Sequence, residues 1–214
     1  MSELFSIQLQ NRQQQGRDGV WLDLPTTTEQ VQAALRQIGI SSDNPQGLFI
    51  SGYFAEEEKR IAIPYNMVLA SNVDELNFLA ARLETLSAGE RAELNAALQT
   101  PQSEFSSIGR ITDFPENVDY YVHLPDVHGP AQLGDYYLNR SGMVNMPEEW
   151  KGGIDTAQFG RYVAQQEQGV FTEYGYLVKS GDAWQKVHEG QPVPEEYRVL
   201  SFPAPEVLRD SANI

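Results

Sequence analysis

Residues 72–100 constrain the fold most, because they predict two amphipathic helices that meet at Ser87. In the first half of this stretch, four leucines recur at spacings that share one face of an α-helix: Leu76, Leu79, Leu83 and Leu86. Charged residues, Glu93 among them, are expected on the outer faces. Two pairs have the spacing of capping boxes, which satisfy free N–H groups at a helix start: Asn72 with Glu75 and Ser87 with Glu90. We therefore expect a helical hairpin in mid-chain.

The sequence before this hairpin predicts strands and one helix. Residues 4–10 and 19–25 have the pattern of two strands joined by a polar turn, and residues 47–54 predict a third strand. Thr26 and Glu29 form another capping-box pattern, so we expect the intervening helix to begin there.

The sequence after the hairpin also mixes strands with helices. It predicts a strand at residues 119–125, a helix at 130–139 and a second helix capped by Asp155. Further alternating runs predict strands within three ranges: 169–180, 183–190 and 197–202. Gly181 and Asp182 between the first two runs predict a hairpin turn.

These elements predict an α+β protein with two small β-rich modules and packed helices flanking the central hairpin. We expect an N-terminal module of a β-sheet plus a helix at residues 1–66. The hairpin occupies residues 67–104, and a C-terminal α+β module occupies residues 105–214.

The most unusual property of the chain is its charge. Its 30 acidic and 15 basic residues give a net charge of −15. Residues 1–104 hold 14 acidic and 7 basic residues, and residues 105–214 hold 16 and 8, so both halves are acidic. Such a surface repels nucleic acid and favours basic partners, including proteins that bind DNA through Lys and Arg. A soluble acidic protein without such a partner would have the same composition.

The sequence also bounds the location of the protein. It contains no cysteine, which excludes disulfides and thiolate zinc sites. No apolar run approaches the roughly 18 residues of a membrane span, and the first ten residues lack the pattern of a signal peptide. We expect a cytoplasmic protein with no membrane partner.

The densest group of possible metal ligands is His123, Asp126 and His128, which fall within six residues. Their spacing matches no standard metal-binding motif, and Asp126 suits a turn equally well. The chain contains no nucleophile elbow, no phosphate-binding loop and no zinc-protease motif. We therefore expect no catalysis and no cofactor, and we keep a metal-dependent enzyme using these three residues as an alternative.

Four stretches resemble, in this order, the ArdA-type antirestriction proteins of mobile genetic elements: residues 19–40, 76–87, 126–138 and 154–178. The sharpest matches are short motifs in the last two stretches: Asp126-Val127, Leu133-Gly134 with Tyr136, Ile154-Asp155, Phe159-Gly160-Arg161, Phe171 and Gly175-Tyr176. We interpret the matched residues as structural, with Gly134 and Gly160 allowing close packing or turns and Asp155 capping a helix.

The resemblance implies an elongated three-domain α+β protein, usually a homodimer, whose acidic surface imitates bent duplex DNA. By that mimicry it would occupy the DNA-binding groove of type I restriction-modification enzymes, without catalysis and without contacting nucleic acid directly. The candidate contact residues are acidic: Glu56, Glu57, Glu58, Asp113, Glu116, Asp119, Asp135, Glu148, Glu149, Glu167 and Glu173. An acidic adaptor for another basic protein is the remaining alternative.

Overall fold

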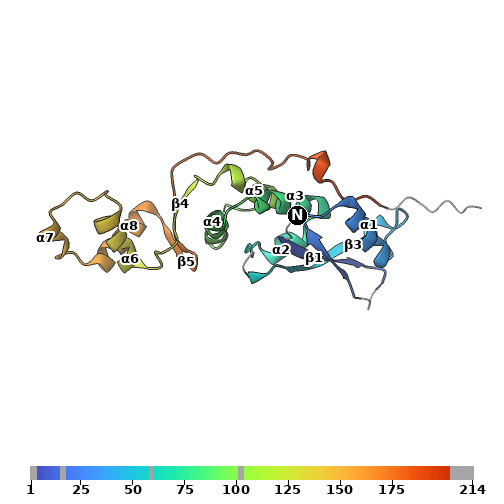
Figure 1. Ribbon diagram of the computed structural model, residues 1–214, viewed down its shortest axis with the longest axis horizontal. Coiled ribbons are helices and arrows are strands. Elements are labelled where there is room, and N and C mark those ends of the chain that lie inside the picture. The colour runs from blue at the N-terminus through green and yellow to red at the C-terminus, as the bar shows by residue number, and fades with distance from the viewer. Residues whose placement is uncertain (1–3, 15–17, 58–59, 101–103, 203–214) are drawn as a thin grey trace, which may run out of the picture. The chain divides into compact units, whose positions relative to one another are not determined.

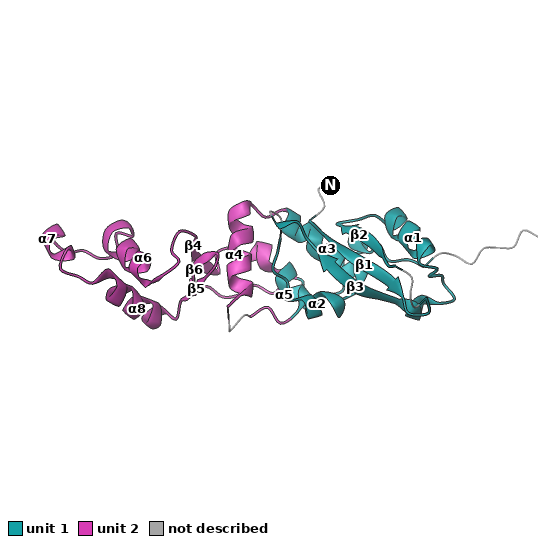
Figure 2. Cartoon of the chain, turned by 90° about the horizontal axis from the view of Figure 1, so that it is seen from below, with its two compact units in different colours: residues 1–84, 107–112, 188–214 teal, residues 85–106, 113–187 magenta. Residues whose placement is uncertain are grey.

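The computed structural model describes residues 4–14, 18–57, 60–100 and 104–202, and it confirms the α+β class (Figure 1). The described residues form eight α-helices and two three-stranded antiparallel sheets. The chain divides into two compact units, which Figure 2 distinguishes by colour. Unit 1 comprises Met1–Glu84, Ser107–Thr112 and His188–Ile214, and unit 2 comprises Thr85–Ser106 and Asp113–Val187.

The sheet of unit 1 has the strand order β2-β1-β3, formed by β1 (Phe5–Asn11), β2 (Val20–Leu24) and β3 (Leu48–Phe54). In the β1–β2 register, Ile7 lies opposite Leu22, and both are buried. Burial alternates along β1, as the period of a strand with one core-facing side requires. The three predicted N-terminal strands are therefore confirmed.

Helix α1 (Thr28–Gln37) packs beside β2 and begins one residue later than predicted. Thr27 is the N-cap, and its hydroxyl accepts a hydrogen bond from the N–H of Gln30 at 3.4 Å. The predicted pair of Thr26 and Glu29 is wrong because Thr26 is buried. Its N–H donates to the side-chain oxygen of Asn77 at 2.7 Å instead.

Unit 1 contains three further helices, which are α2 (Tyr65–Leu69), α3 (Val73–Glu84) and α5 (Ile108–Thr112). The leucine stripe of α3 is buried, as predicted, and α3 contacts both β2 and α5. The predicted capping box is also present. The N–H of Glu75 donates to the side-chain oxygen of Asn72 at 2.9 Å, and the N–H of Asn72 donates to the carboxylate of Glu75 at 3.2 Å.

The C-terminal segment of unit 1 is held by side chains of α3. After a 3-10 turn at Glu195–Tyr197, the N–H groups of Val199 and Leu200 donate to one carboxylate oxygen of Asp74 at 2.8 and 2.7 Å. Asn77 donates to the carbonyl of Tyr197 at 3.0 Å. The predicted strand at residues 197–202 is therefore wrong, because backbone groups of this segment form hydrogen bonds with side chains of α3 and not with a neighbouring strand.

The sheet of unit 2 has the strand order β4-β6-β5, formed by β4 (Tyr121–Leu124), β5 (Val170–Thr172) and β6 (Gly175–Lys179). The β5–β6 hairpin turns at residues 173–174, inside the run that was predicted as one strand. The hairpin expected at Gly181-Asp182 is wrong, since residues 183–190 contain no strand.

Unit 2 contains four helices: α4 (Ala88–Leu98), α6 (Pro130–Asp135), α7 (Glu148–Lys151) and α8 (Thr156–Glu167). The predicted helix at residues 130–139 exists, but its second half is a π-helix at Tyr136–Arg140. α4 packs against β6, and its predicted capping box is confirmed by bonds between Ser87 and Glu90.

The two helices of the predicted hairpin belong to different compact units, α3 to unit 1 and α4 to unit 2. The division into segments 1–66, 67–104 and 105–214 stays a prediction. The longest helices in the described ranges have 12 residues, and none is long and apolar enough to cross a bilayer.

Candidate functional site

The matched motifs of unit 2 hold α6 and α8 in close contact. A Cβ atom at Gly134 would lie 1.9 Å from the carbonyl oxygen of Thr156, and one at Gly160 would lie 1.8 Å from that of Pro130. Asp155 caps α8 by accepting a hydrogen bond from the N–H of Gln158 at 3.0 Å. These residues therefore have the structural roles that the sequence predicted.

The candidate acidic residues differ in exposure. Most are exposed or partly exposed: Glu56, Glu57, Glu116, Asp119, Asp135, Glu148, Glu149, Glu167 and Glu173. Asp113 is buried, and Glu58 lies outside the described residues. Glu56 and Glu57 belong to unit 1 and the other exposed candidates to unit 2, so the structure does not gather them all in one compact unit.

Negative charge is shared between the units. Unit 1 contains 16 acidic and 9 basic residues, for a net charge of −7, and unit 2 contains 14 and 6, for a net charge of −8. Within the described part of unit 2, ion pairs join Arg140 to Asp135 at 3.2 Å, Lys151 to Glu148 at 3.0 Å, and Lys179 to Glu104. Partly exposed pairs of this kind add little stability, but each places a cation beside a carboxylate.

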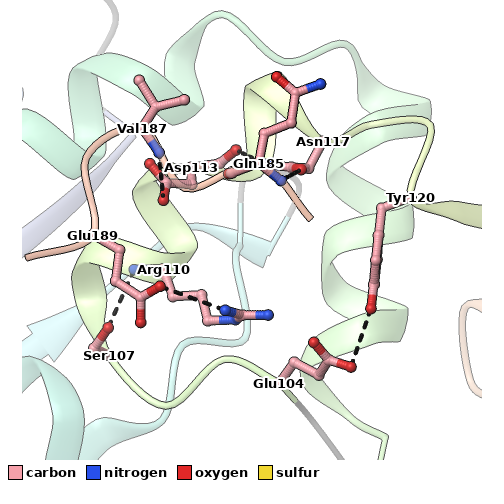
Figure 3. Close-up of polar contacts among 9 residues, drawn as sticks. All are labelled: Glu104, Ser107, Arg110, Asp113, Asn117, Tyr120, Gln185, Val187 and Glu189. Carbon is pink, nitrogen blue, oxygen red and sulfur yellow. Dashed lines mark hydrogen bonds and ion pairs between the residues drawn. The ribbon is translucent and has the colours of Figure 1, made fainter. Parts of the chain in front are cut away.

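Asp113 has a structural role, which corrects its assignment as a contact residue. It is 0% exposed, and its carboxylate accepts a hydrogen bond from the N–H of Val187 at 3.2 Å (Figure 3). Next to it, the Asn117 side chain accepts from the N–H of Gln185 at 2.7 Å and donates to its carbonyl at 3.0 Å. A buried carboxylate with these contacts is not available to a partner, so Asp113 is left out of the proposed contact surface.

Other contacts in Figure 3 also use charged groups to hold the backbone or a side chain in place. In unit 1, the guanidinium group of Arg110 forms a 3.4 Å ion pair with Glu189. The backbone N–H of Arg110 donates to the Ser107 hydroxyl at 3.2 Å. In unit 2, the Tyr120 hydroxyl donates to Glu104 at 3.1 Å. These acids serve the fold of their own unit.

Glu167 anchors two tyrosines in unit 2. Its two carboxylate oxygens accept hydrogen bonds from the hydroxyls of Tyr137 at 2.9 Å and Tyr176 at 2.5 Å. Burial raises the pKa of both tyrosine hydroxyls, and the hydrogen bonds to Glu167 raise it further. Because both oxygens already accept protein hydrogen bonds, we assign Glu167 to the support of the α6–α8 region.

The environment of Glu93 differs from the exposed outer face of α4 that the sequence predicted for this residue. Its side chain is partly buried, and one carboxylate oxygen has no hydrogen-bond partner among the described residues. Burial, together with the nearby charges of Glu90 and Asp119, raises the pKa of the Glu93 carboxyl from 4.5 to about 8. Helical periodicity alone does not reveal this, because Asp119 lies beyond α4.

We expect Glu93→Gln to stabilise the protein at alkaline pH. Because the pKa is raised in the folded state, the stabilisation from protonated Glu93 is fully present below pH 4.5 and is lost as pH rises through 8. The substitution should therefore flatten the fall in unfolding free energy between these values. It should add about 1–3 kcal/mol above pH 8, a figure reduced for the partial exposure of Glu93.

Urea unfolding at pH 5, 7 and 9 measures this effect, with Glu149→Gln as a control at an exposed carboxylate of the same unit. Parallel pH profiles for Glu93→Gln and the parent protein would contradict the prediction.

The alternative metal site is not supported by the geometry. The His123 ring nitrogen Nε2 lies 2.7 Å from the carbonyl oxygen of Tyr174, while Asp126 and His128 are exposed. Across the described ranges, no three His, Asp or Glu side chains are grouped as metal ligands.

The family comparison agrees with the motifs that hold α6 against α8. The model of the family described as antirestriction protein (ArdA) matches residues 15–178. The chain belongs to this family. The match includes α6, α8 and most of both sheets. Membership in the ArdA family supports the assignment of this chain as an antirestriction protein. No curated protein matches the chain.

Proposed function

We propose that this chain is a non-enzymatic antirestriction protein that imitates duplex DNA and occupies the DNA-binding groove of type I restriction-modification enzymes. Its ArdA family membership carries the proposal. The net charges of −7 and −8 on the two units support it, because neither unit lacks the charge that such a groove attracts.

The amount of charge suits the proposal. Duplex DNA carries one negative charge per roughly 1.7 Å of its axis, so 15 charges correspond to about 25 Å of duplex. We propose a homodimer, which would correspond to about 50 Å. No catalytic residue, cofactor or direct nucleic-acid contact is part of this function.

The proposed contact residues are the exposed or partly exposed candidate carboxylates other than Glu167, and some of them also pair with a neighbouring cation. They are Glu56, Glu57, Glu116, Asp119, Asp135, Glu148, Glu149 and Glu173. Because an electrostatic surface distributes its attraction over many charges, no single one of them should be indispensable.

Phage plating tests the function in cells. Expression of the protein should restore plating of unmodified phage in cells that contain a type I system, and should change nothing in cells without one. Equal plating with and without the protein, across several type I systems, would contradict the proposal. A captured partner that is not a restriction subunit would instead favour the adaptor alternative.

Charge neutralisation tests the mechanism. Glu57→Gln alone should change affinity for a type I methyltransferase by less than about threefold. The combined variant Glu56→Gln, Glu57→Gln and Glu173→Gln should weaken binding at least about tenfold and make it less sensitive to salt. Titration at two salt concentrations measures both effects, and a single carboxylate that accounts for the whole loss would contradict distributed mimicry.

A further inference from the structure

Trp150 on α7 is open to solvent, unlike the other tryptophan of unit 2. Trp150 is 66% exposed and packs in no aromatic pair among the described residues. Trp184 instead packs edge-on against Phe105 and Tyr120, with ring centroids 5.6 and 5.1 Å apart. Burying a large exposed aromatic surface in a partner is a common source of binding energy.

The residues beside Trp150 make this surface acidic. Glu148 keeps 82% of its side chain exposed although it pairs with Lys151, whose own side chain is only 18% exposed. Glu149 is exposed, and its side chain makes no hydrogen bond or ion pair within the described ranges. The Lys151 side chain is therefore mostly covered, while the carboxylates of Glu148 and Glu149 and the ring of Trp150 remain accessible to a partner.

This combination suits an arginine better than other side chains. A guanidinium group is planar, stacks on the face of a tryptophan ring and donates paired N–H groups to a carboxylate. A second copy of this chain is a poor occupant of this particular surface, because binding through the same residues would place its Glu148 and Glu149 against identical carboxylates. A purely apolar partner would bury Glu148 and Glu149 without compensation.

We propose that the α7 surface, defined as residues 147–153, binds an arginine-bearing part of the DNA-binding groove of the restriction-modification enzyme. The arginine stacks on Trp150 and donates hydrogen bonds to Glu148 or Glu149. This inference rests on the proposed function and deepens it, because charge imitation alone requires no exposed aromatic ring.

Binding of purified variants to a type I methyltransferase tests the inference. Trp150→Ala should weaken binding at least tenfold, whereas Trp150→Phe should keep most of the affinity because it retains an aromatic face. Met143→Ala is the matched control, since Met143 is an apolar residue with 75% exposure outside α7. Thermal unfolding of all three variants should match that of the parent protein, because these side chains are exposed.

The outcomes separate the inference from the function on which it rests. If the parent protein binds and Trp150→Ala binds equally well, the inference is wrong and the proposed function stands. If the parent protein itself does not bind any type I methyltransferase, both are wrong. If Trp150→Ala changes the oligomeric state in analytical ultracentrifugation without changing affinity, the ring belongs to a contact between copies and the inference is also wrong.

Discussion

Replacing Gly160 by alanine is expected to separate α8 from α6 and to destabilise unit 2 by more than about 3 kcal/mol. The added Cβ would lie 1.8 Å from the Pro130 carbonyl oxygen and 2.8 Å from the Gly134 nitrogen. Both are backbone atoms, so no side-chain rotation can relieve the contact. Gly134→Ala should behave in the same way, because its Cβ would meet the backbone of Thr156 at 1.9 Å.

Hydrogen–deuterium exchange measures this effect separately for each unit. Peptides from α6 and α8 should exchange faster in Gly160→Ala, while those from β1 and β3 of unit 1 should keep their protection. Gly152→Ala is the matched control, because its φ of −62° suits any residue and a Cβ there would meet nothing within 4 Å. Unchanged exchange in α6 and α8 would show that the two helices do not depend on the missing side chains.

The capping motifs show which contacts can be predicted from residues that are close in the sequence. The boxes beginning at Asn72 and Ser87 were predicted correctly because their bonds join residues three positions apart. The box of α1 was shifted by one residue, because Thr26, Thr27 and Thr28 offer several hydroxyls in a row. Only the burial of Thr26 against Asn77, 51 positions away, decides which threonine caps the helix.

The wrongly predicted strands have a related cause. Alternating apolar residues indicate extended backbone, but they do not identify the group that accepts its hydrogen bonds. Val199 and Leu200 donate to Asp74, which is more than 120 positions away, and Val187 donates to Asp113. Such side-chain acceptors replace a neighbouring strand, and no local pattern reveals them.

The candidate surface was harder to predict than the fold. Asp113 lies in a polar connector with a proline, a typical surface pattern, yet it is buried and accepts a backbone hydrogen bond. Glu167 was expected at a contact surface, and its two oxygens accept hydrogen bonds from tyrosines. Whether a carboxylate faces solvent depends on elements that are distant in the sequence. Composition therefore predicts the net charge of the surface better than it predicts which carboxylates lie on that surface.

Leu79→Asp is the second substitution with a large expected effect, and it should unfold unit 1. Leu79 is fully buried in α3, so the new carboxylate would have to lose its hydration within an apolar core. A cost of at least about 4 kcal/mol is a large part of the roughly 5–15 kcal/mol that stabilises a typical domain. Exchange protection should therefore disappear from β1 and β3, and inhibition of restriction should be lost with it.

Leu79→Met is the control, since it keeps the volume and apolar character of the side chain and should cost less than about 1.5 kcal/mol. The comparison with Gly160→Ala then separates the contributions of the units, because each substitution lies in a different one. If unit 2 alone supplies the mimic, Leu79→Asp should leave inhibition largely intact. Loss of inhibition in both variants, each with one unit still protected from exchange, would show that both units must be folded to fill the groove.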